Sequence, residues 1–324
     1  MADRMLVEAV RMALARVMSE DETVILLGED IGRNGGVFRA TNGLLERFGE
    51  QRVRDTPISE QAILGAAMGA AMTGLRPVAD IMFSDFFAVC WDIVVNEIAK
   101  ARYMTDGQVT VPLVIRSANG GGARFGAQHS QSIENWAMAV PGLKVVAPST
   151  PADVVGLMAA SVRDEDPVLF FEHKTLYSVK GEVPDGDIVD TLGKAKVVRE
   201  GTDCTIVALA MMVPRALEAA EQLAADGVSA EVIDLRTLIP LDTETVLNSV
   251  AKTSRAFTVE ENPRALGWGA EIASIVADEA FWDLDAPVRR ITTPHIPLPS
   301  SAPLEDATIP SVERIREEVL QNLD

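Results

Sequence analysis

The sequence predicts an α/β protein made of two doubly wound domains, and three observations support this fold class. Short apolar runs of strand length alternate with segments of helical periodicity, as in parallel sheets covered by helices on both faces. The alternation lapses once, at 174–203, where Gly, Asp and Pro are frequent. The 324 residues are enough for two domains of ordinary size. We expect the domains to span 1–185 and 186–324.

The first half contains five apolar runs that predict buried strands. They lie at 23–30, 76–83, 111–117, 143–149 and 166–173. Helices are predicted between them at 5–18, 59–73, 85–104, 131–139 and 151–163. The last helix has Ser149 or Thr150 as its cap and Pro151 in its first turn.

The second half repeats the alternation after one or two short strands expected within 174–203. Strands are predicted at 204–210, 230–236, 256–261 and 288–293. Helices are predicted at 213–227, 242–253, 267–281 and 309–323. The prolines of "PHIPLP" end the set before the closing helix.

Composition excludes several classes of protein. The net charge of −19 argues against nucleic-acid binding, which needs Lys and Arg to neutralise phosphates, and fits an acidic face for a basic partner. No run of about 18 apolar residues predicts a membrane span, and the first residues lack a signal peptide's apolar core. Cys90 and Cys204 are too few and too distant for a disulfide framework and are expected to be buried thiols. We therefore expect a cytoplasmic protein.

The glycine-rich stretches do not form a nucleotide-binding fingerprint. "GAAMGAAMTG" at 65–74 has glycine spacings unlike G-x-G-x-x-G, and its alanines favour a helix packed closely on another helix or subunit. No P-loop and no His/Cys pattern with zinc spacing occurs.

Polar side chains follow the ends of several predicted strands, where open α/β sheets bind ligands. Glu29 and Asp30 end "LLGED", and Phe86 lies in "MFSDFF". Glu60 opens the almost wholly apolar helix after "DTPIS", and such surroundings disfavour a charged carboxyl, which makes it a candidate proton donor or acceptor. His129, in "GAQHSQS", follows a loop with three consecutive glycines. These residues suggest one site but do not by themselves name a reaction.

Longer segments carry a resemblance to a known family. They are "LLGEDIGRNGGVFRATNGL", "VRDTPISEQAILGAAMGAAMTGLRPVADIMFSDF", "GAQHSQS", "PGLKVVAPSTPADVVGLM", "DPVLFFEHKTLY" and "AEVIDLRTLIPLD". Together they resemble the β subunit of thiamin-diphosphate-dependent 2-oxo acid dehydrogenases. These are the decarboxylating components of the pyruvate, branched-chain 2-oxo acid and acetoin dehydrogenase complexes. The resemblance covers almost the whole chain and implies a pyrimidine-binding domain followed by a transketolase C-terminal-like domain.

The resemblance also implies roles for individual residues. Glu60 matches the glutamate that hydrogen-bonds the aminopyrimidine of thiamin diphosphate and promotes deprotonation of the thiazolium carbon. Phe86 matches the aromatic residue that stacks on the pyrimidine ring, and Ile58 matches a cofactor contact. Glu29 matches an acid close to the cofactor. His129 matches the histidine that steers the substrate-derived intermediate and its transfer to lipoamide.

Two metal sites follow from the same resemblance. A potassium ion is implied at a set of mostly backbone oxygens, those of Leu113, Ser161, Val162, Asp164 and Asp166. The G-D-G element with a later Asn, which holds the diphosphate through Mg²⁺, is missing here although "PDGD" occurs at 184–187. In the family that element belongs to the α subunit. The resemblance therefore implies half a site, completed in an α₂β₂ heterotetramer that acts on the lipoyl-bearing acyltransferase component.

The substrate stays open between related donors. Pyruvate is the first expectation, acetoin the second and branched-chain 2-oxo acids the third. A non-catalytic scaffold subunit and a one-chain transketolase are alternatives of other classes; the first is disfavoured by intact Glu60, Phe86 and His129, the second by length. Leu209-Ala210 and Pro214 depart from the family pattern, and we expect altered partner contacts there. His173 and His295 are expected to make structural hydrogen bonds.

Overall fold

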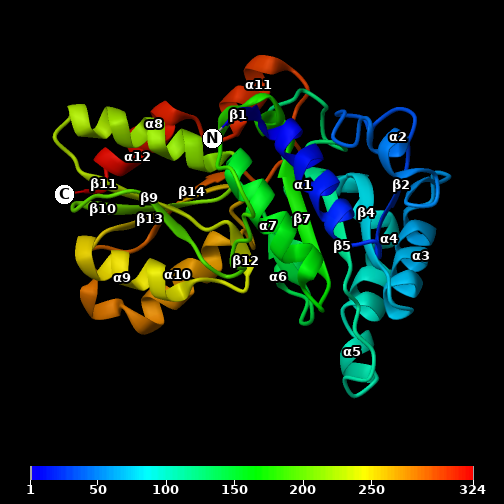
Figure 1. Cartoon of the computed structure of the whole chain (residues 1–324). Helices are drawn as coiled ribbons and strands as arrows, with labels where there is room; N and C mark the ends of the chain where they lie inside the picture. The colour runs from blue at the N-terminus through cyan, green and yellow to red at the C-terminus, as the bar shows by residue number, and fades with distance from the viewer. Residues whose placement is uncertain (1, 324) are drawn as a thin grey trace. The chain divides into compact units, whose positions relative to one another are not determined.

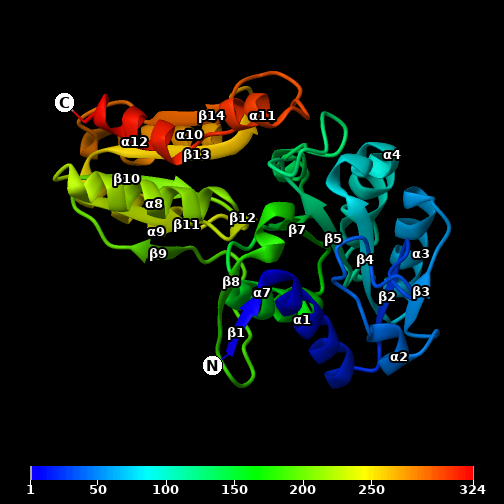
Figure 2. The same ribbon diagram turned by 90° about the horizontal axis from the view of Figure 1, so that it is seen from above.

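The computed structural model describes residues 2–323, which form two compact units (Figures 1 and 2). The first unit comprises 2–119 and 136–192, and the second comprises 120–135 and 193–323. The chain therefore passes between the units three times. The loop that carries His129 groups with the second unit.

The first unit alternates strands and helices along the chain. Its strands are β1 (Ala2–Met5), β2 (Val24–Gly28), β3 (Val53–Asp55), β4 (Arg76–Phe83), β5 (Val114–Asn119), β6 (Lys144–Val146), β7 (Val168–His173) and β8 (Lys180–Val183). Its helices are α1 (Leu6–Glu20), α2 (Leu44–Phe48), α3 (Glu60–Met72), α4 (Phe87–Asp92), α5 (Ala101–Met104), α6 (Glu134–Met138) and α7 (Pro151–Arg163). Short 3₁₀ turns form η1 (Ser84–Phe86) and η3 (Lys174–Ser178).

The main sheet of the first unit is parallel, as the sequence predicts. Its strands lie in the order β6-β7-β5-β4-β2-β3, and every pair runs in the same direction. Figures 1 and 2 show α1 and α7 side by side along one face of this sheet, while α3 packs against β4 from the other. The carboxyl ends of the strands consequently meet at one edge.

The structure corrects one predicted helix and shows how two helices begin. The single helix expected at 85–104 is broken, because Cys90 has non-helical dihedrals (φ −123°, ψ 16°) and a π-helical segment, η2 (Ile93–Ile98), separates α4 from α5. Ser59 occupies the N-cap of α3, but its side chain makes no capping hydrogen bond. Thr150 does cap α7, since its hydroxyl accepts from the Asp153 N–H at 3.1 Å.

The second unit is also doubly wound. Its strands are β9 (Lys196–Arg199), β10 (Cys204–Ala208), β11 (Ala230–Asp234), β12 (Thr237–Ile239), β13 (Ala256–Pro263) and β14 (Arg289–Thr293). Its helices are α8 (Met212–Ala225), α9 (Thr243–Thr253), α10 (Gly269–Glu279), α11 (Ala302–Thr308) and α12 (Val312–Leu320), with a 3₁₀ turn η4 (Phe281–Asp283).

Four strands of this unit run parallel in the order β14-β13-β10-β11, and β9 is added antiparallel at the edge. Figure 1 shows α8 and α12 on one face and α9 and α10 on the other. Side chains such as Ile206, Val232 and Phe257 are almost fully buried between these layers. The predicted two-domain α/β fold is confirmed.

Candidate active site

Glu60 is the first residue of α3, and its side chain is buried although it is a carboxylate (8% of the residue is exposed). The helix that follows packs apolar residues such as Ile63 and Leu64 into the core. The carboxylate makes no hydrogen bond or ion pair with residues 2–323. Both carboxylate oxygens are therefore available to a group from outside this chain.

Glu29 lies directly after β2, at the carboxyl edge of the sheet. Burial raises the pKa of the Glu29 carboxyl, and the negative charges of Glu60, Asp30 and Asp80 raise it further. The structure therefore brings Glu29 and Glu60 close enough for their charges to interact, as the strand-end pattern predicts.

Phe86 ends η1, immediately after β4, and packs edge-on against Phe83 with ring centroids 5.7 Å apart. Its carbonyl accepts a weak hydrogen bond from the Cys90 thiol at 3.7 Å. Burial raises the pKa of Cys90 to about 12, and the charge of Glu60 contributes to that rise. Glu60, Phe86 and Cys90 therefore share one neighbourhood. Ile58, in the segment before α3, is 83% exposed, which is unusual for an isoleucine.

Four residues next to Glu29 form a buried charge network that the predicted site does not include: Asp80, Arg116, Glu172 and Tyr177. Arg116 donates to Glu172 through two hydrogen bonds of 2.9 and 2.7 Å and also pairs with Asp80. The Tyr177 hydroxyl donates to Glu172 at 2.8 Å. Burial, reinforced by the charge of Glu172, raises the pKa of Tyr177 well above its usual value, so this hydroxyl keeps its proton.

Three members of this network, Asp80, Arg116 and Tyr177, line one small pocket together with Glu29, and its free space of about 20 Å³ is enough for a single water molecule. Phe38 closes it by packing against Tyr177 with ring centroids 5.0 Å apart. The sequence does carry a signal for the network: Asp80, Arg116 and Glu172 are charged residues inside otherwise apolar strand runs. Asp80 and Arg116 are direct neighbours in the register of β4 and β5.

His129 lies in the loop Gly120–Asn135, which packs with the second unit. It is half-buried, and its backbone N–H donates to the Gly126 carbonyl at 3.3 Å. The structure thus gathers Glu29, Glu60 and Phe86 in the first unit and holds His129 in the second.

The five residues expected to bind potassium lie just before β5, in the last turn of α7 and directly after α7, and the carbonyls of four of them already accept hydrogen bonds. Arg76 donates to the carbonyls of Val162 and Asp164 at 3.0 and 3.1 Å. The Leu113 carbonyl accepts from the Val168 N–H at 2.9 Å. Each carbonyl oxygen keeps a second lone pair, so this oxygen-only donor set suits a hard cation.

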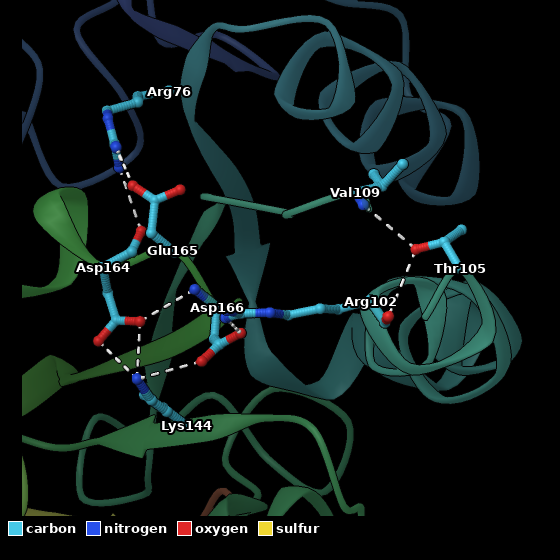
Figure 3. A network of polar contacts seen from close by, with 8 residues as sticks. All are labelled: Arg76, Arg102, Thr105, Val109, Lys144, Asp164, Glu165 and Asp166. Atoms are coloured by element: carbon cyan, nitrogen blue, oxygen red, sulfur yellow. Dashed lines mark hydrogen bonds and ion pairs between the residues drawn. The ribbon is translucent and has the colours of Figure 1, made fainter. Parts of the chain in front are cut away.

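The carboxylates of this set are paired with basic side chains (Figure 3). Lys144 donates to both carboxylate oxygens of Asp164 at 2.6 Å and lies 3.5 Å from Asp166. Arg102 donates to Asp166 at 2.6 Å. The carboxylates of Asp164 and Asp166 are therefore paired with basic side chains of the protein, and the backbone carbonyl oxygens are the ligands available to a cation.

The remaining histidines and cysteines behave differently from one another. His173 caps η3: its Nδ1 accepts from the Thr175 N–H at 3.3 Å, as expected of a structural histidine. His295 is exposed and makes no side-chain hydrogen bond with the described residues, so the structural role predicted for it is wrong. Cys90 and Cys204 are buried free thiols, as predicted.

Residues 2–323 contain neither a side-chain metal cluster nor a helix that could span a membrane. No group of three or more His, Cys, Asp or Glu side chains there is arranged to hold a metal ion. No helix in the same range is long and apolar enough to cross a membrane.

Comparison with known proteins agrees with this geometry. Residues 3–180 match the transketolase pyrimidine-binding domain, and residues 193–315 match the transketolase C-terminal domain. A solved split-gene transketolase, described as an inactive β4 tetramer, superposes on this chain with a TM-score of 0.81 at 26% sequence identity. The match covers 98% of this chain and 97% of the transketolase chain.

Curated relatives match over nearly their full lengths. The chain is 47% identical to the β subunit of acetoin:2,6-dichlorophenolindophenol oxidoreductase of Bacillus subtilis, over 95% of this chain and 94% of that protein. It is 47% identical to the 2-oxoisovalerate dehydrogenase β subunit of the same organism, with coverage of 92% and 91%. It is 45% identical to the pyruvate dehydrogenase E1 β subunit there, with coverage of 93% for each. The chain therefore belongs to the family of dehydrogenase β subunits in which a transketolase-type pyrimidine-binding domain is followed by a transketolase C-terminal domain.

Proposed function

We propose that this chain is the β subunit of a thiamin-diphosphate-dependent 2-oxo acid dehydrogenase, with pyruvate as the donor. Together with an α subunit it decarboxylates the donor and reductively acylates the lipoyl group of an acyltransferase component. The observation that carries the proposal is Glu60, a buried carboxylate with no partner among residues 2–323. It lies in one neighbourhood with Phe86 and with the raised-pKa carboxyl of Glu29.

These residues fit an aminopyrimidine. The Glu60 carboxyl would share a proton in a hydrogen bond with a ring nitrogen, and Phe86 offers an aromatic face for stacking. Thiamin diphosphate, when bound, supplies a carbon nucleophile. Glu60 would hold the proton that must move at the pyrimidine. Ile63 and Leu64, in the same turn of α3, are buried beside it in the chain.

Glu29 and His129 complete the contribution of this chain. The raised pKa of the Glu29 carboxyl makes it a candidate for proton exchange beside the cofactor. His129 donates a hydrogen bond to the substrate-derived group and steers its transfer to the lipoyl arm. Without these two residues the cofactor would bind, but the later proton transfers would slow.

Two surfaces support an assembly in which the α subunit supplies the other half of the site. Ile58 is 83% exposed, as expected for a residue that a cofactor or partner covers. On α3, Ala62, Ala66 and Gly69 are exposed, a small apolar face on which another subunit can approach closely. We assign the Mg²⁺-diphosphate contacts to the α subunit, the assembly to α₂β₂, and the complex to the cytoplasm.

The substrate assignment has two competitors. Relatives named for pyruvate dehydrogenase reach 46% identity, while the relatives named for acetoin reach 47% in two organisms. Identities this close do not rank the donors, so acetoin is the second candidate. Branched-chain 2-oxo acids come third.

We also propose that the carbonyls of Leu113, Ser161, Val162 and Asp164, with Asp166, take up potassium in the assembled enzyme. Thermal unfolding of the complex in KCl and in tetramethylammonium chloride of equal ionic strength tests this. A higher melting temperature in KCl supports the site, and equal melting temperatures contradict it.

The proposed function is tested on the chain co-expressed with an α subunit, in the presence of thiamin diphosphate and Mg²⁺. Reduction of an artificial electron acceptor is followed with pyruvate, acetoin and branched 2-oxo acids in parallel. Preference for pyruvate supports the proposal, and preference for acetoin replaces the substrate. A complex that assembles and binds cofactor but turns over none of them contradicts the proposal and favours a scaffold subunit.

A further inference from the structure

We infer that two buried glutamates of the second unit, Glu261 and Glu305, are positioning residues for His129. They hold the glycine-rich segment 120–135, called here the His129 loop, by binding its backbone N–H groups. The inference rests on the proposed function of His129 and deepens it, because it identifies what fixes the histidine in place.

The start of the His129 loop is built as an anion-binding nest. Gly120, Gly122, Arg124 and Gly126 all have left-handed φ values, of 85°, 83°, 65° and 74°. Left-handed residues alternating with ordinary ones turn successive N–H groups toward one side of the backbone, and such concave arrays bind anions. The alternation explains why glycine recurs here and why Arg124 accepts an unfavourable conformation.

Glu305 fills this nest from α11. Its Oε1 accepts the Gly122 N–H at 2.9 Å, and its Oε2 accepts the Arg124 N–H at 3.2 Å. The Arg124 guanidinium adds a third contact to Oε2 at 2.8 Å. Glu305 is completely buried (0% exposed), so these bonds replace all the hydration that its carboxylate loses.

Glu261 clamps both ends of the loop from β13. Its Oε1 accepts the Gly121 N–H near the start and the Ser132 hydroxyl near the end, the latter at 2.9 Å. The neighbouring Asn262 donates to the Ser132 carbonyl at 2.8 Å. The loop also closes on itself, because the Gly120 N–H donates to the Gln131 carbonyl at 3.1 Å.

The start of the His129 loop is closely packed at Gly121. A Cβ placed on Gly121 would lie 2.8 Å from Leu298 and 2.9 Å from Ile309, both of which are buried. The loop backbone therefore packs directly against apolar side chains of the second unit. His129 lies between two segments of the loop, 120–124 and 131–132, that are hydrogen-bonded to Glu261 and Glu305. The two carboxylates therefore fix the backbone on both sides of the histidine.

The decisive variants are Glu305→Gln and Glu261→Gln in the complex with the α subunit. At Glu305, where both carboxylate oxygens accept loop N–H groups, the glutamine keeps the shape of the side chain but must point its NH₂ group at a donor. At Glu261 it leaves a neutral amide oxygen where a charged carboxylate accepted both loop bonds, which weakens them. Glu260→Gln is the matched control: Glu260 is adjacent on β13 and equally buried, but it binds Arg290 and the Gly269 N–H instead of the loop. His129→Gln tests the proposed function separately.

Two measurements on these complexes separate positioning from folding. Hydrogen–deuterium exchange of peptides within 120–135 should become about tenfold faster in the two loop variants and stay unchanged in Glu260→Gln. Turnover should show kcat lowered about tenfold or more with KM for the 2-oxo acid unchanged, because a displaced histidine weakens the transition state and not substrate binding. A general loss of stability would instead affect Glu260→Gln as well.

Each result decides one question. Unchanged exchange in both Glu305→Gln and Glu261→Gln overturns the inference. Faster exchange with full activity also overturns it, since the loop would then move without consequence for turnover. Full activity in His129→Gln would instead overturn the proposed role of the histidine, whatever the exchange rates of the glutamate variants are.

Discussion

Arg116 and Glu172 are joined side by side in the interior of the first unit by two parallel hydrogen bonds, of 2.9 and 2.7 Å. Asp80 adds a second carboxylate to the same guanidinium. Paired in this way the three charges tolerate burial, but none of them tolerates it alone.

Arg116→Met should therefore be strongly destabilising. It leaves Asp80 and Glu172 buried without their cation, which costs about 3–5 kcal/mol in the free energy of unfolding. Denaturant unfolding measures the loss. Arg33→Met, at an exposed arginine of the same unit, is the control and should change stability by less than about 0.5 kcal/mol. Equal effects of the two changes would contradict the role of the network.

Glu29→Gln should change how stability depends on pH. The folded protein holds the Glu29 proton more tightly than the unfolded chain, whose pKa is near 4.5, because burial and the charges of Glu60, Asp30 and Asp80 raise the folded value. The wild type therefore loses stability as pH rises from about 4.5 through the folded pKa, and the glutamine variant does not. The melting temperature of the variant relative to wild type should rise with pH across that window. Glu46→Gln, at an exposed acid, controls for the lost charge, and a gap that is constant with pH would contradict the assignment.

Glu60→Gln should lower kcat without preventing assembly. The amide keeps the shape of the side chain but cannot take part in the proton transfer at the pyrimidine, and loss of such a group costs about 10²-fold or more. Turnover with the preferred donor measures this, with Glu50→Gln, in an exposed turn, as the control. A Glu60→Gln complex with full activity would show that the carboxylate is not the catalytic group.

Ala210→Gly should stabilise the second unit. Ala210 has a φ of +49°, a left-handed conformation that costs a non-glycine residue about 1–2 kcal/mol. Glycine removes this cost but loses about 0.4–1 kcal/mol through the greater freedom of the unfolded chain. The net gain should be about 0.5–1 kcal/mol by these figures, measured by denaturant unfolding. A loss of stability would mean that the methyl group packs better than its conformation suggests.

The sequence predicts the regular parts of the fold closely because their signals are local. The strand at 76–83 and the helix at 151–163 have the same bounds in the structure as in the prediction, since apolar periodicity and a capping residue mark them. The break at Cys90 and the seven-residue α11 were not foreseen. Neither leaves a periodic pattern long enough to detect.

In the candidate site too, some residues are predictable from local sequence and others are not. Glu29, Glu60 and Phe86 are predicted because each directly follows or opens a regular element, and the structure brings them together. Glu305 binds Arg124, which is 181 residues away in sequence, and Arg116 binds Glu172, which is 56 residues away. Which buried carboxylate meets which donor depends on tertiary packing, and no spacing in the sequence encodes it.

Because the chain passes three times between its two units, recombination between related genes is constrained. The His129 loop is encoded within the stretch that matches the pyrimidine-binding domain, yet its N–H groups are satisfied by carboxylates encoded about 140 to 180 residues later. Recombination near residue 192 would therefore separate the histidine from the residues that hold it. The two domains can be exchanged between relatives only as a pair, or together with compensating changes at the loop.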